Sequence, residues 1–181
     1  MNVKKLNFIN ISRDIEKILK ESKAIHKINQ DNYFKSKIVL EDNFKKKMKE
    51  KGFLEIASGS NRIVFGMKKF PEIVAKVVLI CRNSNINELE FYKKVKKIKN
   101  KYYRNKFMRV YYHSDDFEII ICEKLHSILW SKKPFDDIDK YIENIFKKIG
   151  LRLTDIRKGN IMSRAVNSKK LSQLVFCDFG E

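Results

Sequence analysis

The sequence predicts an α+β fold in which strands are grouped together instead of alternating one by one with helices. Two observations support this prediction. Apolar residues recur at helical spacing in residues 1–52 and again after residue 136. Between these segments, short apolar runs are separated by turn-forming residues, and a single helical segment interrupts them.

Residues 1–52 are expected to form an N-terminal helical extension. Gly52 can end its second helix, because glycine readily adopts the left-handed conformation that follows a helix. The two apolar stripes that predict the helices are Ile11, Ile15, Ile18 and Leu19, and then Leu40, Phe44 and Met48.

The remaining chain divides into a strand-rich part, residues 53–122, and a final part, residues 123–181. In the strand-rich part the expected strands are 53–56, 62–66, 73–80 (opened by Pro71), 107–112 and 117–122, with a helix at 86–98 and a turn at 114–116. In the final part, an apolar stripe predicts a helix from Asp136 that stops at Gly150, followed by short apolar pieces at 151–153, 161–162 and 174–177.

The composition indicates a folded, strongly basic protein. Of 181 residues, 43% are apolar, and 40 Lys and Arg against 22 Asp and Glu give a net charge of +18. This excess favours acidic or polyanionic partners, although the charge is spread along the chain and a lysine-rich composition alone would also produce it. No apolar run approaches the length of a transmembrane segment, and no signal peptide is recognised, so a cytoplasmic protein is expected.

The cysteines Cys81, Cys122 and Cys177 are widely separated and form no Cys-x-x-Cys pair. A disulfide framework and a zinc site are therefore not expected. Each cysteine lies among apolar residues, where we expect it to act as a small buried hydrophobe.

Two charged residues stand in apolar surroundings. Lys76 is the one charge within Ile-Val-Ala-Lys-Val-Val-Leu-Ile, and a buried ammonium is costly unless it is paired. It could instead face water from a half-exposed strand. On the following helix, Glu88 has Phe91, Tyr92 and Val95 at +3, +4 and +7, so it should face inward and could reach Lys76, whereas Glu90 should face water.

Two further segments carry oxygen ligands near strand ends. Asp155 and Asn160 share one short loop and could bind a metal or orient a hydroxyl, although an ordinary Asp/Asn/Gly turn has the same composition. Asp178 follows the apolar run 174–177 and precedes Phe179 and Gly180, which is a suitable place for a metal-binding carboxylate.

Taken together, these segments resemble the protein-kinase-like superfamily from about Phe53 onward. A small-residue turn, a strand lysine, a helix glutamate, Asp-x-x-x-x-Asn and Asp-Phe-Gly occur in the order of the kinase signature. The short chain is most similar to small atypical bacterial or phage kinase-like proteins, with the YrbL-like group the nearest. The resemblance implies a five-stranded antiparallel N-lobe with one helix at 53–122, and a hinge with a minimal helical C-lobe at 123–181.

The resemblance also implies ATP and Mg²⁺ as cofactors and assigns roles in the N-lobe. Backbone N–H groups of Gly59, Ser60 and Asn61 would cover the phosphates. Lys76, positioned by Glu88, would hold the α- and β-phosphates. Further nucleotide contacts are implied for Arg62 and Val64 on the second strand, and for the backbone of Glu123 and Leu125 at the hinge.

In the C-lobe, the resemblance implies that Asp155 accepts the proton of the attacking hydroxyl, and that Asn160 and Asp178 hold Mg²⁺. Arg157 stands where protein kinases usually carry lysine and could stabilise the γ-phosphate. Two departures weaken the match. Ala57 and Arg62 replace two glycines of the glycine-rich loop, and only Glu181 follows the Asp-Phe-Gly tripeptide.

Three functions remain open at this stage. The first is an active kinase, directed at Ser or Thr of a protein with an acidic surface or at a small molecule. The second is a pseudokinase that acts as a protein-binding or inhibitory module, suggested by the two departures. Nucleic-acid binding ranks third; it is suggested by the charge and by Lys101-Tyr102-Tyr103-Arg104, which could also be a basic loop with its tyrosines packed inward.

Overall fold

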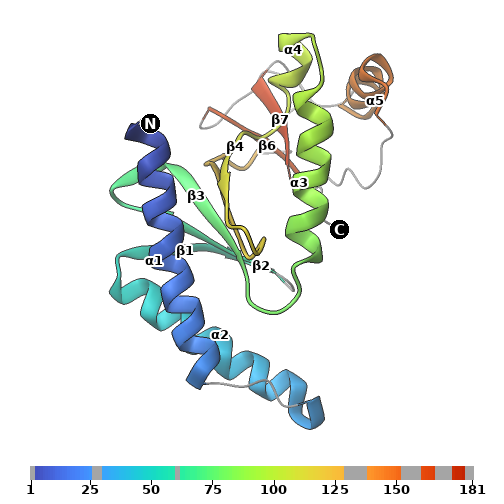
Figure 1. Ribbon diagram of the computed structural model, residues 1–181. Coiled ribbons are helices and arrows are strands. Elements are labelled where there is room, and N and C mark those ends of the chain that lie inside the picture. The colour runs from blue at the N-terminus through green and yellow to red at the C-terminus, as the bar shows by residue number, and fades with distance from the viewer. Residues whose placement is uncertain are drawn as a thin grey trace. The chain divides into compact units, whose positions relative to one another are not determined.

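The computed structural model describes residues 3–25, 30–59, 62–128, 138–151, 160–165 and 173–177. The fold is α+β, as predicted, with a five-stranded antiparallel sheet (Figure 1). The chain forms two compact units: the first comprises Met1–Asn85 and Val110–Glu123, and the second comprises Ile86–Arg109 and Lys124–Glu181.

The sheet belongs to the first unit and has the strand order β1-β2-β3-β5-β4. Its strands are β1 (Phe53–Ser58), β2 (Arg62–Met67), β3 (Phe70–Val78), β4 (Val110–His113) and β5 (Ile119–Glu123). All five were predicted, but their boundaries differ by up to three residues, most at the starts of β3 and β4. β3 begins before Pro71, which therefore lies inside the strand. β4 begins only at Val110, because Phe107 instead forms a bridge with Phe176 in the second unit.

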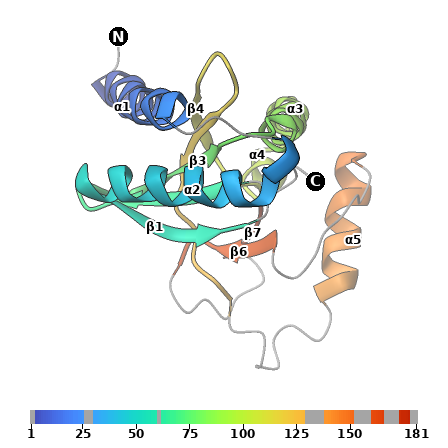
Figure 2. The ribbon, with the colours of Figure 1, turned by 90° about the horizontal axis from the view of Figure 1, so that it is seen from below.

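Helices α1 (Val3–Ile25) and α2 (Tyr33–Glu50), separated by a 3-10 turn η1 (Gln30–Asn32), pack on the sheet (Figure 2). Both predicted apolar stripes are buried and form one core with alternate residues of the strands. At the end of α2, Gly52 has φ +83° and its N–H donates to the carbonyl of Lys49 over 3.0 Å. The helices thus cover one face of the sheet, as their spacing predicted. The sheet residues of this core are Phe53, Ile63, Phe65, Met67, Ile73, Ala75, Val77, Ile119 and Ile121.

The second unit has its own aromatic core. It contains α3 (Asn83–Lys96), which starts in the first unit, together with α4 (Lys101–Arg104), α5 (Ile138–Ile149), and the antiparallel strands β6 (Ile161–Ser163) and β7 (Leu174–Phe176). Phe107, Phe146 and Phe176 pack together with ring centroids 5.3–5.7 Å apart. The predicted stripe of α5 is buried, and Gly150 follows with φ +67°.

Two smaller expectations were wrong. Cys81 is exposed, because β3 ends at Val78 and Cys81 lies in the connection to α3, whereas Cys122 and Cys177 are buried as expected. Tyr102 is 54% exposed on the short helix α4, so only Tyr103 packs inward. In the part of the chain that the structure describes, no helix is long and apolar enough to cross a membrane.

The packing of α2 on the sheet can be tested with two phenylalanines of the same helix. Phe44 is fully buried against Phe65, whose ring centroid is 5.7 Å away, whereas Phe34 is 79% exposed. We expect Phe44→Ala to lower the free energy of unfolding by about 3–5 kcal/mol through lost burial and a residual cavity. Phe34→Ala should change it by less than about 0.5 kcal/mol. Equal effects in urea unfolding would contradict this arrangement.

Candidate functional site

Lys76 lies in the middle of β3 and is only 7% exposed. In the sheet register it stands between Val64 of β2 and Ile120 of β5. Its neighbours Ala75 and Val77 belong to the core under α1 and α2. Because side chains alternate along a strand, Lys76 projects from the opposite face. The alternative that Lys76 faces water from a half-exposed strand is therefore wrong. Its side chain is buried on a face with apolar neighbours.

The same face carries residues that were not predicted to belong to the site. One step further along the strands, Gly66, Val74 and Cys122 stand opposite one another. Val74 and Cys122 are buried. An apolar surface thus continues from Lys76 toward the end of β5. Alternation counted from Lys76 would have found Val74.

At the sheet edge, Leu54 and Ile56 of β1 add to this face and are 44% and 47% exposed. Leu54 pairs with Gly66, and a Cβ at Gly66 would lie 2.7 Å from Cδ1 of Ile56. Glycine therefore leaves the space that the Ile56 side chain occupies. A register shift between Glu55 and Ala57 interrupts the alternation, so the sequence pattern alone could not place Ile56 on this side.

The turn between β1 and β2 lies just beyond Lys76 along the strands. Gly59 N–H donates to the carbonyl of Arg62 over 2.9 Å, and Arg62 pairs with Val78. A Cβ added at Gly59 would meet only the Arg62 carbonyl oxygen, at 3.8 Å, and its φ is outside the left-handed region. Local packing therefore does not require glycine here. Ser60 and Asn61 lie outside the described residues.

At the other end of this face, β5 ends at Glu123, which is 6% exposed. Glu123 pairs with Ile73, so its side chain shares the side of the helix-covered core, while its backbone follows directly on Cys122. Leu125 is half-buried and belongs to the second unit. The next residue, His126, exchanges two backbone hydrogen bonds with Ser163, over 2.7 and 2.9 Å.

In the second unit, Glu88 on α3 is 2% exposed and Glu90 is exposed, which agrees with the predicted inward and outward faces. The pairing of Glu88 with Lys76 stays a prediction. Asn160 immediately precedes β6, and its carbonyl accepts from the N–H of Cys177 over 2.9 Å and from Cys177 Sγ over 3.3 Å. The β6–β7 hairpin thus places Asn160 opposite the residue that precedes Asp178 in the sequence.

Three further predicted site residues, Asp155, Arg157 and Asp178, also lie outside the described residues. Within the described ranges, no group of three or more His, Cys, Asp or Glu could hold a metal ion. Comparison of the chain with protein-family models gives no match, and comparison with curated proteins gives none.

A second buried lysine, Lys106, lies between two tyrosines of the second unit and is 3% exposed. Its Nζ is 4.9 Å from the ring centroid of Tyr102 and 5.6 Å from that of Tyr141. Burial lowers the pKa of the Lys106 ammonium; the Tyr102 hydroxyl opposes this effect and the Arg164 guanidinium adds to it. Lys106 lies in the turn after α4, four positions after Tyr102, whereas Tyr141 comes from the distant helix α5, so no local pattern predicted the complete site.

The lowered pKa of Lys106 predicts a pH dependence of stability. Between the folded and the unfolded pKa, the unfolded chain binds more protons, so the free energy of unfolding rises with pH. Wild type should therefore gain stability relative to Lys106→Met as pH rises from roughly 7 to 10. Thermal unfolding across this range measures the difference, with Lys101→Met as the exposed control. A difference that stays constant or shrinks would contradict the assignment.

Proposed function

We propose that this chain binds ATP with Mg²⁺ and transfers its γ-phosphoryl group to a hydroxyl, as a protein-kinase-like phosphotransferase directed at Ser or Thr. The supporting observation is the buried Lys76 on an apolar sheet face opposite the face that α1 and α2 cover. A buried ammonium is costly unless an anionic group compensates its charge, and the phosphates of a nucleotide can supply such negative charge.

The order of features along the strands supports ATP as the ligand. The turn at Gly59 comes first and is followed by Lys76. Next comes the row of paired residues that includes Val74 and Cys122, which we call a level, and finally the backbone after Glu123. Successive same-face levels are two residues, or roughly 6–7 Å, apart. We place the phosphates between the turn and Lys76, and the base on the apolar levels beyond it. Adenine needs an apolar surface and backbone hydrogen-bonding groups, and this end of the face offers both.

The second unit supplies the proposed metal ligands. Mg²⁺ prefers oxygen ligands, and Asn160 and Asp178 carry an amide and a carboxylate oxygen. The hydrogen bonds between Asn160 and Cys177 support their use at one site, because Asp178 is the next residue after Cys177. When bound, the ion neutralises phosphate charge that develops during transfer.

In the proposed reaction, Asp155 accepts the proton of the acceptor hydroxyl as its oxygen bonds to the γ-phosphorus. The bond from this phosphorus to the β–γ bridging oxygen breaks, and ADP leaves. Arg157 and Lys76 stabilise charge on the phosphates. Because the net charge is +18, a protein acceptor with an acidic surface is the preferred partner class.

Lys76→Met tests the nucleotide site directly. The change removes the ammonium and retains a similar volume, so we expect the affinity for ATP with Mg²⁺, measured by calorimetry, to fall at least about tenfold through loss of a charge-assisted contact. Lys68→Met, in the exposed β2–β3 turn, is the matched control because it makes the same change in net charge. Equal affinity in wild type and Lys76→Met would exclude the proposed site.

The same measurements separate a kinase from a pseudokinase. We expect Asp155→Asn to retain ATP binding and to lose phosphoryl transfer to an acidic protein substrate, while Asp178→Asn loses Mg²⁺-dependent binding. Wild-type ATP binding without transfer to any protein or small-molecule hydroxyl would support the pseudokinase alternative.

Gly59→Ala tests whether a ligand approaches the turn closely. Because a Cβ has room there, we expect the free energy of unfolding to change by less than about 1 kcal/mol. A phosphate held by the turn would nevertheless meet the new methyl group, so ATP affinity should fall severalfold. Unchanged affinity in calorimetry would show that the turn does not contact the nucleotide.

A further inference from the structure

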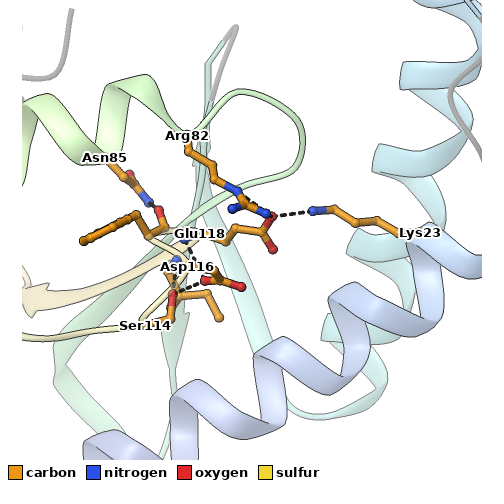
Figure 3. A network of polar contacts seen from close by, with 8 residues as sticks. Lys23, Arg82, Asn85, Ser114, Asp116 and Glu118 are labelled. Carbon is orange, nitrogen blue, oxygen red and sulfur yellow. Dashed lines mark hydrogen bonds and ion pairs between the residues drawn. The ribbon is translucent and has the colours of Figure 1, made fainter.

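A polar network in the first unit joins three segments that are distant in the sequence (Figure 3). Its centre is Glu118, between β4 and β5. Glu118 Oε1 accepts from Lys23 Nζ of α1 over 2.8 Å. The same oxygen accepts from Arg82, which precedes α3, over 3.0 Å from Nε and 2.8 Å from Nη2. One carboxylate therefore holds the end of α1 and the approach to α3.

Because Glu118 is buried, its carboxylate needs these two contacts to compensate its charge. Glu118 is 7% exposed, and a buried carboxylate is costly without compensating charge. The side chains of Lys23 and Arg82 are 34% and 49% exposed, so neither cation would be stranded if the carboxylate were removed. Glu118 therefore depends on its two partners for charge compensation more than they depend on it.

The turn that carries Glu118 is itself tied to α3. Phe117 has φ +60°, which is unfavourable for a bulky residue, and its carbonyl accepts from Asn85 Nδ2 over 2.9 Å. Asn85 is fully buried in the first turn of α3. Arg82 and Asn85 therefore bind neighbouring residues of the turn. Arg82 binds the side chain of Glu118, and Asn85 binds the backbone carbonyl of Phe117.

Hydrogen bonds within the turn hold its conformation. The Ser114 hydroxyl donates to Asp116 Oδ1 over 2.6 Å, and the Glu118 N–H donates to the same oxygen over 3.1 Å. Burial would raise the pKa of the Asp116 carboxyl, but these hydrogen bonds and nearby cations outweigh it and lower that pKa. The turn therefore presents Glu118 and the Phe117 carbonyl from a braced backbone.

We propose that Glu118 is a positioning residue through which the end of the N-terminal helix α1 fixes the first turn of α3. Asn85 precedes Glu88 by three residues, or about one helical turn. A constraint on the start of α3 is therefore a constraint on the segment from which Glu88 projects. The effect on α3 stands by itself, whereas its consequence for nucleotide binding rests on the proposed function.

Hydrogen exchange followed by mass spectrometry tests the effect on α3. In Glu118→Gln, amides of peptides covering residues 83–92 should exchange about tenfold faster or more, because charged hydrogen bonds that hold this turn are lost. Lys23→Ala should accelerate the same peptides, to a smaller extent, since Arg82 still pairs with Glu118. Lys23 is partly exposed, so this variant keeps the test valid if Glu118→Gln does not fold.

Lys47→Ala is the matched control. It removes another ion pair between α1 and its surroundings, with Glu21 at 3.4 Å, outside this network. Exchange in 83–92 should then equal that of wild type. Unchanged exchange in Lys23→Ala would overturn the role of α1, and equal acceleration in Lys47→Ala would show only general loosening and would also overturn it.

ATP affinity of the same variants separates the two proposals. If wild type binds ATP, Lys23→Ala should weaken binding severalfold, and unchanged affinity despite faster exchange would overturn the link between α3 and the nucleotide. If wild type does not bind ATP, the proposed function fails, while the exchange result alone decides whether Glu118 positions α3.

Discussion

The enclosure of one lysine ammonium within a sheet is the constraint on which the account depends. Lys76 is flanked in register by Val64 and Ile120, and water reaches only 7% of its surface. The desolvation of an ammonium is costly, so its charge needs an anionic group nearby to compensate it. In the proposed function the phosphates of ATP contribute this negative charge, and the apolar residues beyond Lys76 on the same face contact the remainder of the nucleotide.

The helix-covered core and Lys76 lie on opposite faces of the sheet. The face that includes Ala75 and Val77 is covered by α1 and α2, and the apolar stripes of these helices pack against it. Because this face needs no further partner, the strands can present Lys76 on the opposite face from a rigid support. The N-terminal helices also reach the β4–β5 turn through Lys23 and Glu118, so their packing bears on α3 as well as on the sheet.

The sequence predicted the elements better than the geometry of the site. The helix stripes and the strand containing Lys76 could be predicted because buried residues recur with a fixed period along each element. Helix α4 was missed because it is only four residues long and depends on Asn100, whose side chain accepts from the N–H of Tyr102 over 2.9 Å. Ile56 could not be placed because a register shift breaks the alternation of β1. The Glu118 network joins residues up to 95 positions apart, and no local pattern encodes such contacts.

Labelling with an acyl-phosphate derivative of ATP tests the central claim most directly, because this reagent acylates the lysine that lies beside the bound phosphates. After digestion, mass spectrometry identifies the modified lysines. The account predicts that Lys76 is modified and that an excess of ATP with Mg²⁺ protects it, while exposed lysines such as Lys68 react weakly and without protection. Modification confined to exposed lysines and unaffected by ATP would contradict the assignment of Lys76 to a nucleotide site.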